Sequence, residues 1–241
     1  MISNKSKILT IVCWLTIFSI AMAFLENAIV IYLRELYYPG GFDFPLAPME
    51  PDIALTEIIR EAATMIILIC VGIIAGRNFS EKFAYFIYCF AIWDIFYYVF
   101  LKLLLNWPDS FMTWDLLFLI PVTWAGPVIT PIILSLTMIL LAVLVVFFNE
   151  KTGNVRISQI EWLILIFGSL VVILSFTWDY SKFILQHYSI IEIFSASSRE
   201  GLFDLAFQYI PRSFNWWLYG LGELIILFGI GFFYFRNKNS K

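Results

Sequence analysis

Hydrophobic residues in this chain fall into six long runs that are separated by shorter polar stretches. The runs cover residues 8–33, 54–76, 82–104, 127–148, 159–178 and 214–235. Each run has about the 20 mostly apolar residues that a helix needs to cross a bilayer. We therefore expect an all-α, polytopic integral membrane helical bundle with six transmembrane helices, in which residues 1–241 form a single transmembrane domain.

The first run also has features of a cleaved signal peptide. Lys5 and Lys7 precede it, and Ala21 and Ala23 match the small residues of a cleavage site. The apolar run, however, continues through residues 29–31. We therefore interpret it as a retained first helix.

Basic residues predict the orientation of the bundle. Because cytoplasmic loops carry the excess of Lys and Arg, we expect both termini to be cytoplasmic and the chain to be a multi-pass protein of the cell membrane. Arg60 lies inside a span, and the other basic residues divide nine to five between the two sides. The nine on the side of the N-terminus are Lys5, Lys7, Arg77, Lys82, Lys151, Arg156, Arg236, Lys238 and Lys241, and the five on the opposite side are Arg34, Lys102, Lys182, Arg199 and Arg212.

The segment before the fourth span contains several helix-breaking residues. Pro121, Pro127 and Pro131, with Gly126 among them, should interrupt a continuous helix. We expect a Pro-broken segment with a short interfacial or re-entrant piece near 113–121, followed by a full span. The alternative is a short surface helix followed by an ordinary span.

Two other long segments lie on the predicted extracytoplasmic side. Residues 35–53 are rich in proline and glycine and should form an ordered irregular loop. Residues 181–210 mix aromatic, aliphatic and charged residues, so we expect one or two interfacial helices between the fifth and sixth spans. The cytoplasmic turns are short, and the function is therefore expected on the extracytoplasmic side.

Composition excludes several classes of protein. Of the 241 residues, 61% are hydrophobic and 14% are charged, whereas a soluble domain is roughly 45–50% apolar and about 25% charged. Too little polar surface remains for a soluble enzyme or a disordered chain. A net charge of −3 without a basic tract excludes a nucleic-acid-binding protein, so the lipid bilayer is the expected partner.

Ionisable residues inside the spans are the strongest functional signal. Each costs on the order of 2.5–3.5 kcal/mol in a bilayer, and such residues are functional candidates by default. Glu57, Arg60 and Glu61 share one helix face by their spacing. Counted at about 1.5 Å per residue, the charged residues in four spans lie roughly 10–15 Å below the outer boundary. The predicted ligand-binding residues at this level are Glu26, Asn27, Glu57, Arg60, Glu61, Asp94, Tyr97, Tyr98, Tyr219 and Glu223.

The predicted cluster has more acids than bases. Arg60 should pair with one or two carboxylates, because its guanidinium stays charged and takes bidentate acceptors. The remaining carboxylates should be protonated or should face a cation, and a hard divalent ion suits an all-oxygen site. The alternative is an ion-pair network that only fixes helix packing. The candidate metal ligands are Glu26, Glu61, Asp94 and Glu223.

Tryptophan followed by aspartate occurs three times, at residues 93–94, 114–115 and 178–179. Tryptophan is enriched at membrane interfaces, so we interpret the last two pairs as interfacial anchors. The first pair belongs to the predicted polar cluster. Trp124 is a candidate cap for that cluster.

The sequence excludes several cofactors. A single histidine, His187, cannot supply bis-histidine haem ligation or a zinc triad, and no phosphate-binding loop marks a nucleotide site. Cys13, Cys70 and Cys89 lie in apolar runs, which argues against a disulfide framework. No motif identifies a family.

Three functions fit these observations. The favoured one is an integral membrane protein that binds or moves a cation, a proton or a small solute in its outer half. The second is a membrane enzyme that acts on a lipid or isoprenoid-like substrate at the outer leaflet, with Glu61 or Asp94 as the catalytic base and Arg60 as an anion clamp. The third is a non-catalytic subunit or assembly factor in an oligomer or a larger membrane complex.

Overall fold

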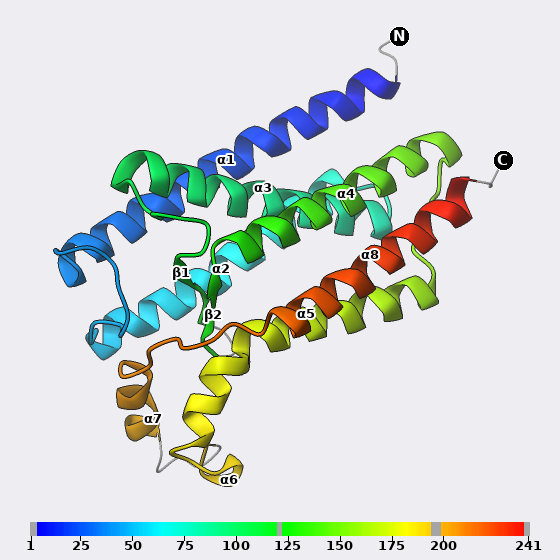
Figure 1. Cartoon of the computed structure of the whole chain (residues 1–241). Helices are drawn as coiled ribbons and strands as arrows, with labels where there is room; N and C mark the ends of the chain where they lie inside the picture. The colour runs from blue at the N-terminus through cyan, green and yellow to red at the C-terminus, as the bar shows by residue number, and fades with distance from the viewer. Residues whose placement is uncertain (1–3, 120–121, 194–198, 239–241) are drawn as a thin grey trace.

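The computed structural model describes residues 4–119, 122–193 and 199–238 (Figure 1). This part of the chain is mostly helical. Its elements are α1 (Asn4–Tyr37), α2 (Pro51–Ala75), α3 (Phe79–Leu105), β1 (Trp114–Phe118), β2 (Trp124–Pro127), α4 (Ile129–Thr152), α5 (Gln159–Leu185), α6 (Ile190–Ile193), α7 (Arg199–Ala206) and α8 (Trp216–Lys238).

Six of these helices, α1 to α5 and α8, are long and apolar enough to cross a membrane. They correspond one to one to the six predicted spans, so the sequence prediction of a six-helix bundle is confirmed. The helices extend past the predicted limits at several ends, most clearly in α5, which continues to Leu185. Six such helices are compatible with a multi-pass integral membrane protein.

Both chain termini lie at the same end of the bundle, which we call the terminal end (Figure 1). The opposite end, the loop end, carries the irregular segment after α1 and the short helices α6 and α7 (Figure 1). In the bundle, α3 packs against α1, α2 and α4, while α5 packs against α8 and α4 also contacts α8. The interfacial placement of α6 and α7 and the orientation of the termini stay predictions.

Polar residues define where the helices begin and end at the terminal end. Asn78 caps α3 by accepting a hydrogen bond from the Glu81 backbone N–H at 3.0 Å. Ser158 and Glu161 form a reciprocal capping box at the start of α5. Gly153, in the left-handed conformation with φ of 80°, ends α4.

Glycine lets α5 and α8 approach closely. A Cβ atom on Gly222 would lie 2.9 Å from the Val172 backbone nitrogen and 3.0 Å from the Gly168 carbonyl oxygen. These distances are too short for a carbon atom, so only glycine fits at this crossing. Small residues at helix contacts are a common means of packing in membranes.

A two-stranded antiparallel hairpin precedes α4, where the sequence predicted a short interfacial or re-entrant piece. Asp115 of β1 lies opposite Gly126 of β2. The all-α expectation is therefore incomplete, and Pro121 lies outside the described residues. Strands of four and five residues inside an apolar stretch cannot be told from helix by periodicity, which explains the missed hairpin.

The hairpin reaches into the bundle. The Leu119 backbone N–H donates hydrogen bonds to both carboxylate oxygens of Glu61 in α2, at 3.1 Å. A Cβ atom on Gly126 would lie 3.0 Å from the Phe176 ring of α5. Because Glu61 is ten residues into α2, this contact lies about 15 Å along that helix from its start at the loop end.

Candidate functional site

A cavity of about 80 Å³ lies beneath the hairpin, in the half of the bundle toward the loop end. Four carboxylates from four different elements line it, namely Glu26 of α1, Glu61 of α2, Asp94 of α3 and Asp115 of β1. Arg60 also lines the cavity. The volume exceeds the roughly 10–15 Å³ that a single water molecule needs, so the cavity has room for a small ligand.

Arg60 is held by two carboxylates. Its Nε donates to Glu57 Oε2 at 2.8 Å, and its Nη1 forms an ion pair with Glu26. The first partner lies one turn earlier on α2, and the second lies on α1. The guanidinium therefore joins two helices, and its single charge is already shared between two acids.

Each of the other three carboxylates has a neutral hydrogen-bond donor. Asp94 accepts a hydrogen bond from Ser135 Oγ at 2.7 Å, and Asp115 accepts one from the Tyr98 hydroxyl at 3.0 Å. Glu61 accepts the Leu119 N–H. Among the described residues, no basic side chain comes within 4.0 Å of Asp94 or Asp115. Their charges are also close enough to repel each other.

Asp115 is a buried acid on the hairpin, with an exposed fraction of 2%. Burial raises the pKa of Asp115 to about 6, and the hydrogen bond from Tyr98 and the positive charge of Arg34 oppose that rise. Its carboxyl group therefore holds a proton up to a higher pH than an exposed aspartate does.

The charges of the group do not balance. Arg60 forms ion pairs with Glu26 and Glu57, whereas Asp94 and Asp115 have no basic side chain within 4.0 Å in the described part of the chain. Such a site can hold a proton, a cation, or both in exchange. Within the described residues, no three Asp, Glu, His or Cys side chains come together in a way that could hold a metal ion. The predicted metal set of Glu26, Glu61, Asp94 and Glu223 is not assembled there.

Six of the ten predicted ligand-binding residues line the cavity, and four do not. The six are Glu26, Arg60, Glu61, Asp94, Tyr97 and Tyr98, and the four are Asn27, Glu57, Tyr219 and Glu223.

Glu223 and Tyr219 form a separate polar group between α8 and α4. Thr137 Oγ1 donates to Glu223 Oε2 at 3.1 Å. The Tyr219 hydroxyl lies 2.8 Å from the Thr130 carbonyl oxygen and 3.1 Å from Glu223 Oε1. Asn27 instead joins α1 to α3, because its Nδ2 donates to the Tyr97 carbonyl oxygen at 3.1 Å.

Sequence reasoning missed Asp115, which we had interpreted as part of an interfacial anchor. The structure places it on the cavity wall with an exposed fraction of 2%. The repeated Trp-Asp pair was the available signal, because Asp94 in the first pair lines the same cavity. Trp93 and Trp124 also line it, and the expected position of Trp124 beside the polar cluster agrees with this.

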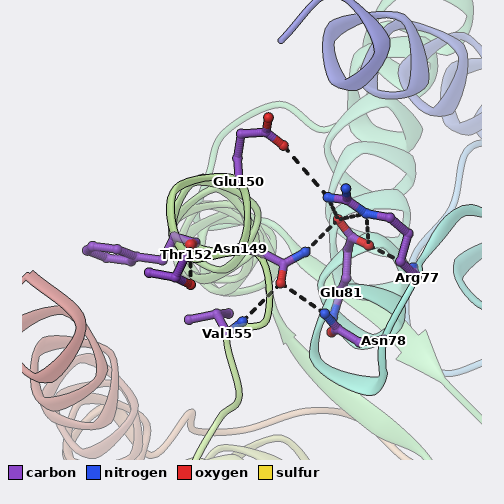
Figure 2. Close-up of polar contacts among 8 residues, drawn as sticks. Arg77, Asn78, Glu81, Asn149, Glu150, Thr152 and Val155 are labelled. Atoms are coloured by element: carbon purple, nitrogen blue, oxygen red, sulfur yellow. Dashed lines mark hydrogen bonds and ion pairs between the residues drawn. The ribbon is translucent and has the colours of Figure 1, made fainter. Parts of the chain in front are cut away.

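A second buried polar group lies at the terminal end (Figure 2). Glu81, with an exposed fraction of 1%, forms an ion pair with Arg77 at 2.8 Å. Asn149 Nδ2 donates to Glu81 Oε1 at 3.1 Å. Asn149 Oδ1 in turn accepts from Asn78 Nδ2 at 2.9 Å and from the Val155 N–H at 3.0 Å. These bonds join the start of α3 to the end of α4, as Figure 2 shows.

A matching pair joins α5 to α8 at the same end. Arg236 Nε donates to Glu161 Oε1 at 2.7 Å, and Arg236 Nη2 donates to Glu161 Oε2 at 2.8 Å. Glu161 has an exposed fraction of 0%. Each fully buried carboxylate at the terminal end therefore contacts a guanidinium, and Arg77 also lies 3.8 Å from Glu150 Oε2 (Figure 2).

The cavity and the terminal-end pairs thus differ, because Glu81 and Glu161 each contact an arginine, whereas Asp94 and Asp115 line a cavity and form no ion pair among the described residues. Its walls combine carboxylates, hydroxyls and aromatic rings from α1 to α5 and the hairpin. Comparison of the chain with protein-family models, curated protein sequences and solved structures finds no match.

Proposed function

We propose that this chain is an integral protein of the cell membrane, with cytoplasmic termini, that binds a small cation or a proton in the cavity beneath the hairpin. The observation that carries the proposal is the surplus of carboxylates around that cavity. Arg60 is neutralised by Glu26 and Glu57. Asp94 and Asp115 then line the cavity with neutral hydrogen-bond donors, the Ser135 hydroxyl for Asp94 and the Tyr98 hydroxyl and Leu116 N–H for Asp115. Ionised acids in such surroundings are stabilised by a positive ligand.

A purely structural network is a weaker explanation. A network that only fixes helix packing tends toward neutrality and fills its space, as Glu161 and Arg236 do at the terminal end. The acidic group instead leaves a cavity of about 80 Å³ beside unpaired carboxylates. These features favour a site that binds a ligand.

The size of the cavity favours a small ligand over a lipid. Binding pockets for drug-sized molecules measure about 300–1,000 Å³, several times this volume. Arg60 is also engaged by two carboxylates, which argues against its predicted role as an anion clamp. A proton or a cation of a few atoms fits both observations.

A lipid ligand or lipid enzyme is the second candidate, and one observation favours it. A groove of about 540 Å³ lies between α3 and α4, and Tyr98 lines both this groove and the cavity. A lipid chain in the groove would touch the ring of Tyr98, whose hydroxyl donates to Asp115. In this case Asp94 or Glu61 would serve as the base.

Cation-dependent stabilisation tests the favoured function. The purified protein in lipid nanodiscs is heated at pH 7.5 in sodium, potassium, ammonium or calcium chloride at constant ionic strength. A ligand at 100 times its Kd stabilises a protein by about 2.7 kcal/mol, so binding raises the unfolding midpoint. We expect at least one cation to do so, and Asp94→Asn to abolish the shift.

Asp109→Asn is the matched control, because Asp109 is an exposed acid at the loop end that does not line the cavity. It should retain the full shift. A second measurement follows proton release when the cation is added to weakly buffered protein. The proposal is wrong if no cation raises the midpoint and the pH dependence of unfolding is the same in the native protein, Asp94→Asn and Asp115→Asn.

A further inference from the structure

The acidic cavity has an aromatic wall that the charge argument does not use. We define the aromatic wall as the rings of Phe90, Trp93, Phe118, Trp124 and Phe176, all of which line the cavity. They form a continuous series of ring contacts. Phe90 stacks on Phe118, and Trp124 stacks on Phe176, with interplanar angles of 11° and 13°. Aromatic faces attract organic cations, and cages of such rings recognise ammonium groups.

Two donors in this wall have no partner. The indole N–H groups of Trp93 and Trp124 are buried, and no acceptor in the described part of the chain bonds either of them. Trp93 as a whole has an exposed fraction of 8%. An unsatisfied buried donor is destabilising, so two of them in the lining of one cavity favour an occupant that supplies acceptor atoms.

The occupant must therefore be complementary to two kinds of group. Asp94 and Asp115 are complementary to a positively charged group that donates hydrogen bonds, and the two indole N–H groups are complementary to a hydrogen-bond acceptor. A bare metal ion cannot accept a hydrogen bond, and no three acidic side chains among the described residues converge to ligate one. An anion would be repelled by the surplus of carboxylates.

We infer that the cavity binds a small organic cation that carries both an ammonium group and an oxygen acceptor, the chemistry of a short amino alcohol. Its ammonium group lies between Asp94 and Asp115 and against the aromatic wall. Its oxygen accepts the free indole N–H groups of Trp93 and Trp124. A molecule of about four non-hydrogen atoms matches the small cavity. This inference rests on the proposed function and names the class of cation.

Paired ligands test the inference without depending on absolute affinity. Ethanolamine and ethylammonium chloride carry the same charge at pH 7.5, but only ethanolamine has an oxygen. Calorimetric titration of the protein in phosphatidylcholine nanodiscs should show ethanolamine binding about 3- to 10-fold more tightly, the effect of one or two neutral hydrogen bonds. The Asp94→Asn variant should bind neither ethanolamine nor ethylammonium.

Removal of single indole N–H groups then locates the oxygen. Trp93→Phe and Trp124→Phe keep an aromatic ring but lack the donor, so the preference for ethanolamine should fall toward equal binding of the two amines. Trp217→Phe is the control, because Trp217 is 90% exposed, and it should keep the full preference. A ratio of two affinities in one variant does not depend on how stable that variant is, and Trp124→Phe serves if Trp93→Phe fails to fold.

The results of these experiments distinguish a failure of the amino alcohol proposal from a failure of the proposed cation binding. Equal binding of the two amines by the native protein overturns the inference. Stabilisation by a metal cation but by neither amine overturns it too, while the proposed cation binding survives. No response to any cation or to protons overturns both.

The same amino alcohol chemistry occurs in free amines and in phospholipid headgroups. If the headgroup is the source, nanodiscs that contain phosphatidylethanolamine raise the unfolding midpoint without added amine, and Trp93→Phe reduces this effect. If the free amine is the source, the lipid makes no difference. Either result supports the shared chemistry and identifies its source.

Discussion

The two ends of this bundle bury carboxylates in opposite ways. At the terminal end, Glu81 and Glu161 are almost completely buried, and each pairs with an arginine. Toward the loop end, Asp94 and Asp115 line a cavity and accept hydrogen bonds from neutral donors, with no basic side chain within 4.0 Å among the described residues. At one end the most buried acids contact guanidinium groups, and at the other two acids line a cavity without such a contact among the described residues.

The difference has an energetic meaning. An ionised carboxylate loses several kcal/mol of solvation on burial, and a close guanidinium with good geometry offsets most of that loss. The terminal-end pairs meet this condition and can be understood as packing devices. Asp94 and Asp115 do not meet this condition, because no guanidinium contacts them among the described residues, and this difference supports the proposed binding site.

The largest effect is expected where a matched pair is broken. Arg236→Gln leaves Glu161, which has an exposed fraction of 0%, without its guanidinium. Removing one partner of a buried pair costs about 3–5 kcal/mol, and we expect about 3 kcal/mol because Arg236 itself is partly exposed. Thermal unfolding in nanodiscs should show a midpoint lower by roughly 5–10 °C.

Lys238→Gln is the matched control for this variant. Lys238 lies two residues further along α8, and its ammonium group lies 5.7 Å from the centroid of the Tyr234 ring, without a carboxylate partner among the described ion pairs. Its loss should change the midpoint by less than about 2 °C. If the two variants behave alike, the terminal-end pair does not carry the stability that we assign to it.

A pH titration addresses the opposite end. The pKa of Asp115 is raised to about 6, so between about pH 4 and pH 6 the folded protein holds a proton that the unfolded chain has lost. Stability from this group is therefore present below about pH 4 and decreases as the pH rises toward 6. The difference corresponds to on the order of 2–3 kcal/mol.

Comparison with Asp115→Asn isolates this contribution. In the absence of added cation, the native protein should lose stability over this range, and the variant should show a shallower dependence. A cation that binds the ionised form should restore stability above pH 6 in the native protein only. Identical pH profiles for both proteins would contradict the assignment of Asp115 as a buried titrating acid.

The six helices and part of the cavity lining could be predicted from the sequence. Long apolar runs identify the six helices because a membrane helix must satisfy its backbone internally over about 20 residues. The spacing of Arg60 and Glu61 on α2, together with the predicted depth of Glu26 and Asp94, indicates that these charged residues lie at a similar distance from the outer membrane boundary. These four residues do line one cavity.

The rest depended on how the helices turn toward one another. A spacing of three or four residues fixes which side chains share a face, but it does not fix which neighbour that face meets. The same depth is predicted for Glu223, which bonds Thr137 and Tyr219 and does not line the cavity. Asp115 reaches the cavity only because β1 folds back into the bundle, and short strands in an apolar stretch leave no distinct pattern.

A smaller effect is expected when the hydroxyl beside Asp115 is removed. Tyr98→Phe keeps the ring between the cavity and the groove but deletes the hydrogen bond to Asp115 Oδ2. This bond favours the ionised carboxylate, so its loss should raise the pKa of Asp115 further. Cation affinity at pH 7 should fall by about 2- to 10-fold, as calorimetry can measure.

The control for Tyr98→Phe is Tyr219→Phe, which removes a hydroxyl from the separate group around Glu223. It should leave cation affinity unchanged. Equal losses in both variants would indicate a general effect on the bundle. A loss of cation affinity in Tyr219→Phe alone would place the cation beside Glu223 and not in the cavity.

The smallest change in stability is expected from Asp94→Asn, and this is the sharpest contrast with Arg236→Gln. Each variant removes one charge beside a carboxylate, Glu161 in the first case and Asp115 in the second. At the terminal end that removal leaves Glu161 without its partner, whereas at the cavity it relieves the repulsion between Asp94 and Asp115. An asparagine can still accept the Ser135 hydroxyl through its side-chain oxygen. Without added cation, the unfolding midpoint should therefore stay within about 2 °C of the native value or rise. A clear drop would mean that Asp94 is a structural partner after all, and that its charge is balanced in the folded protein.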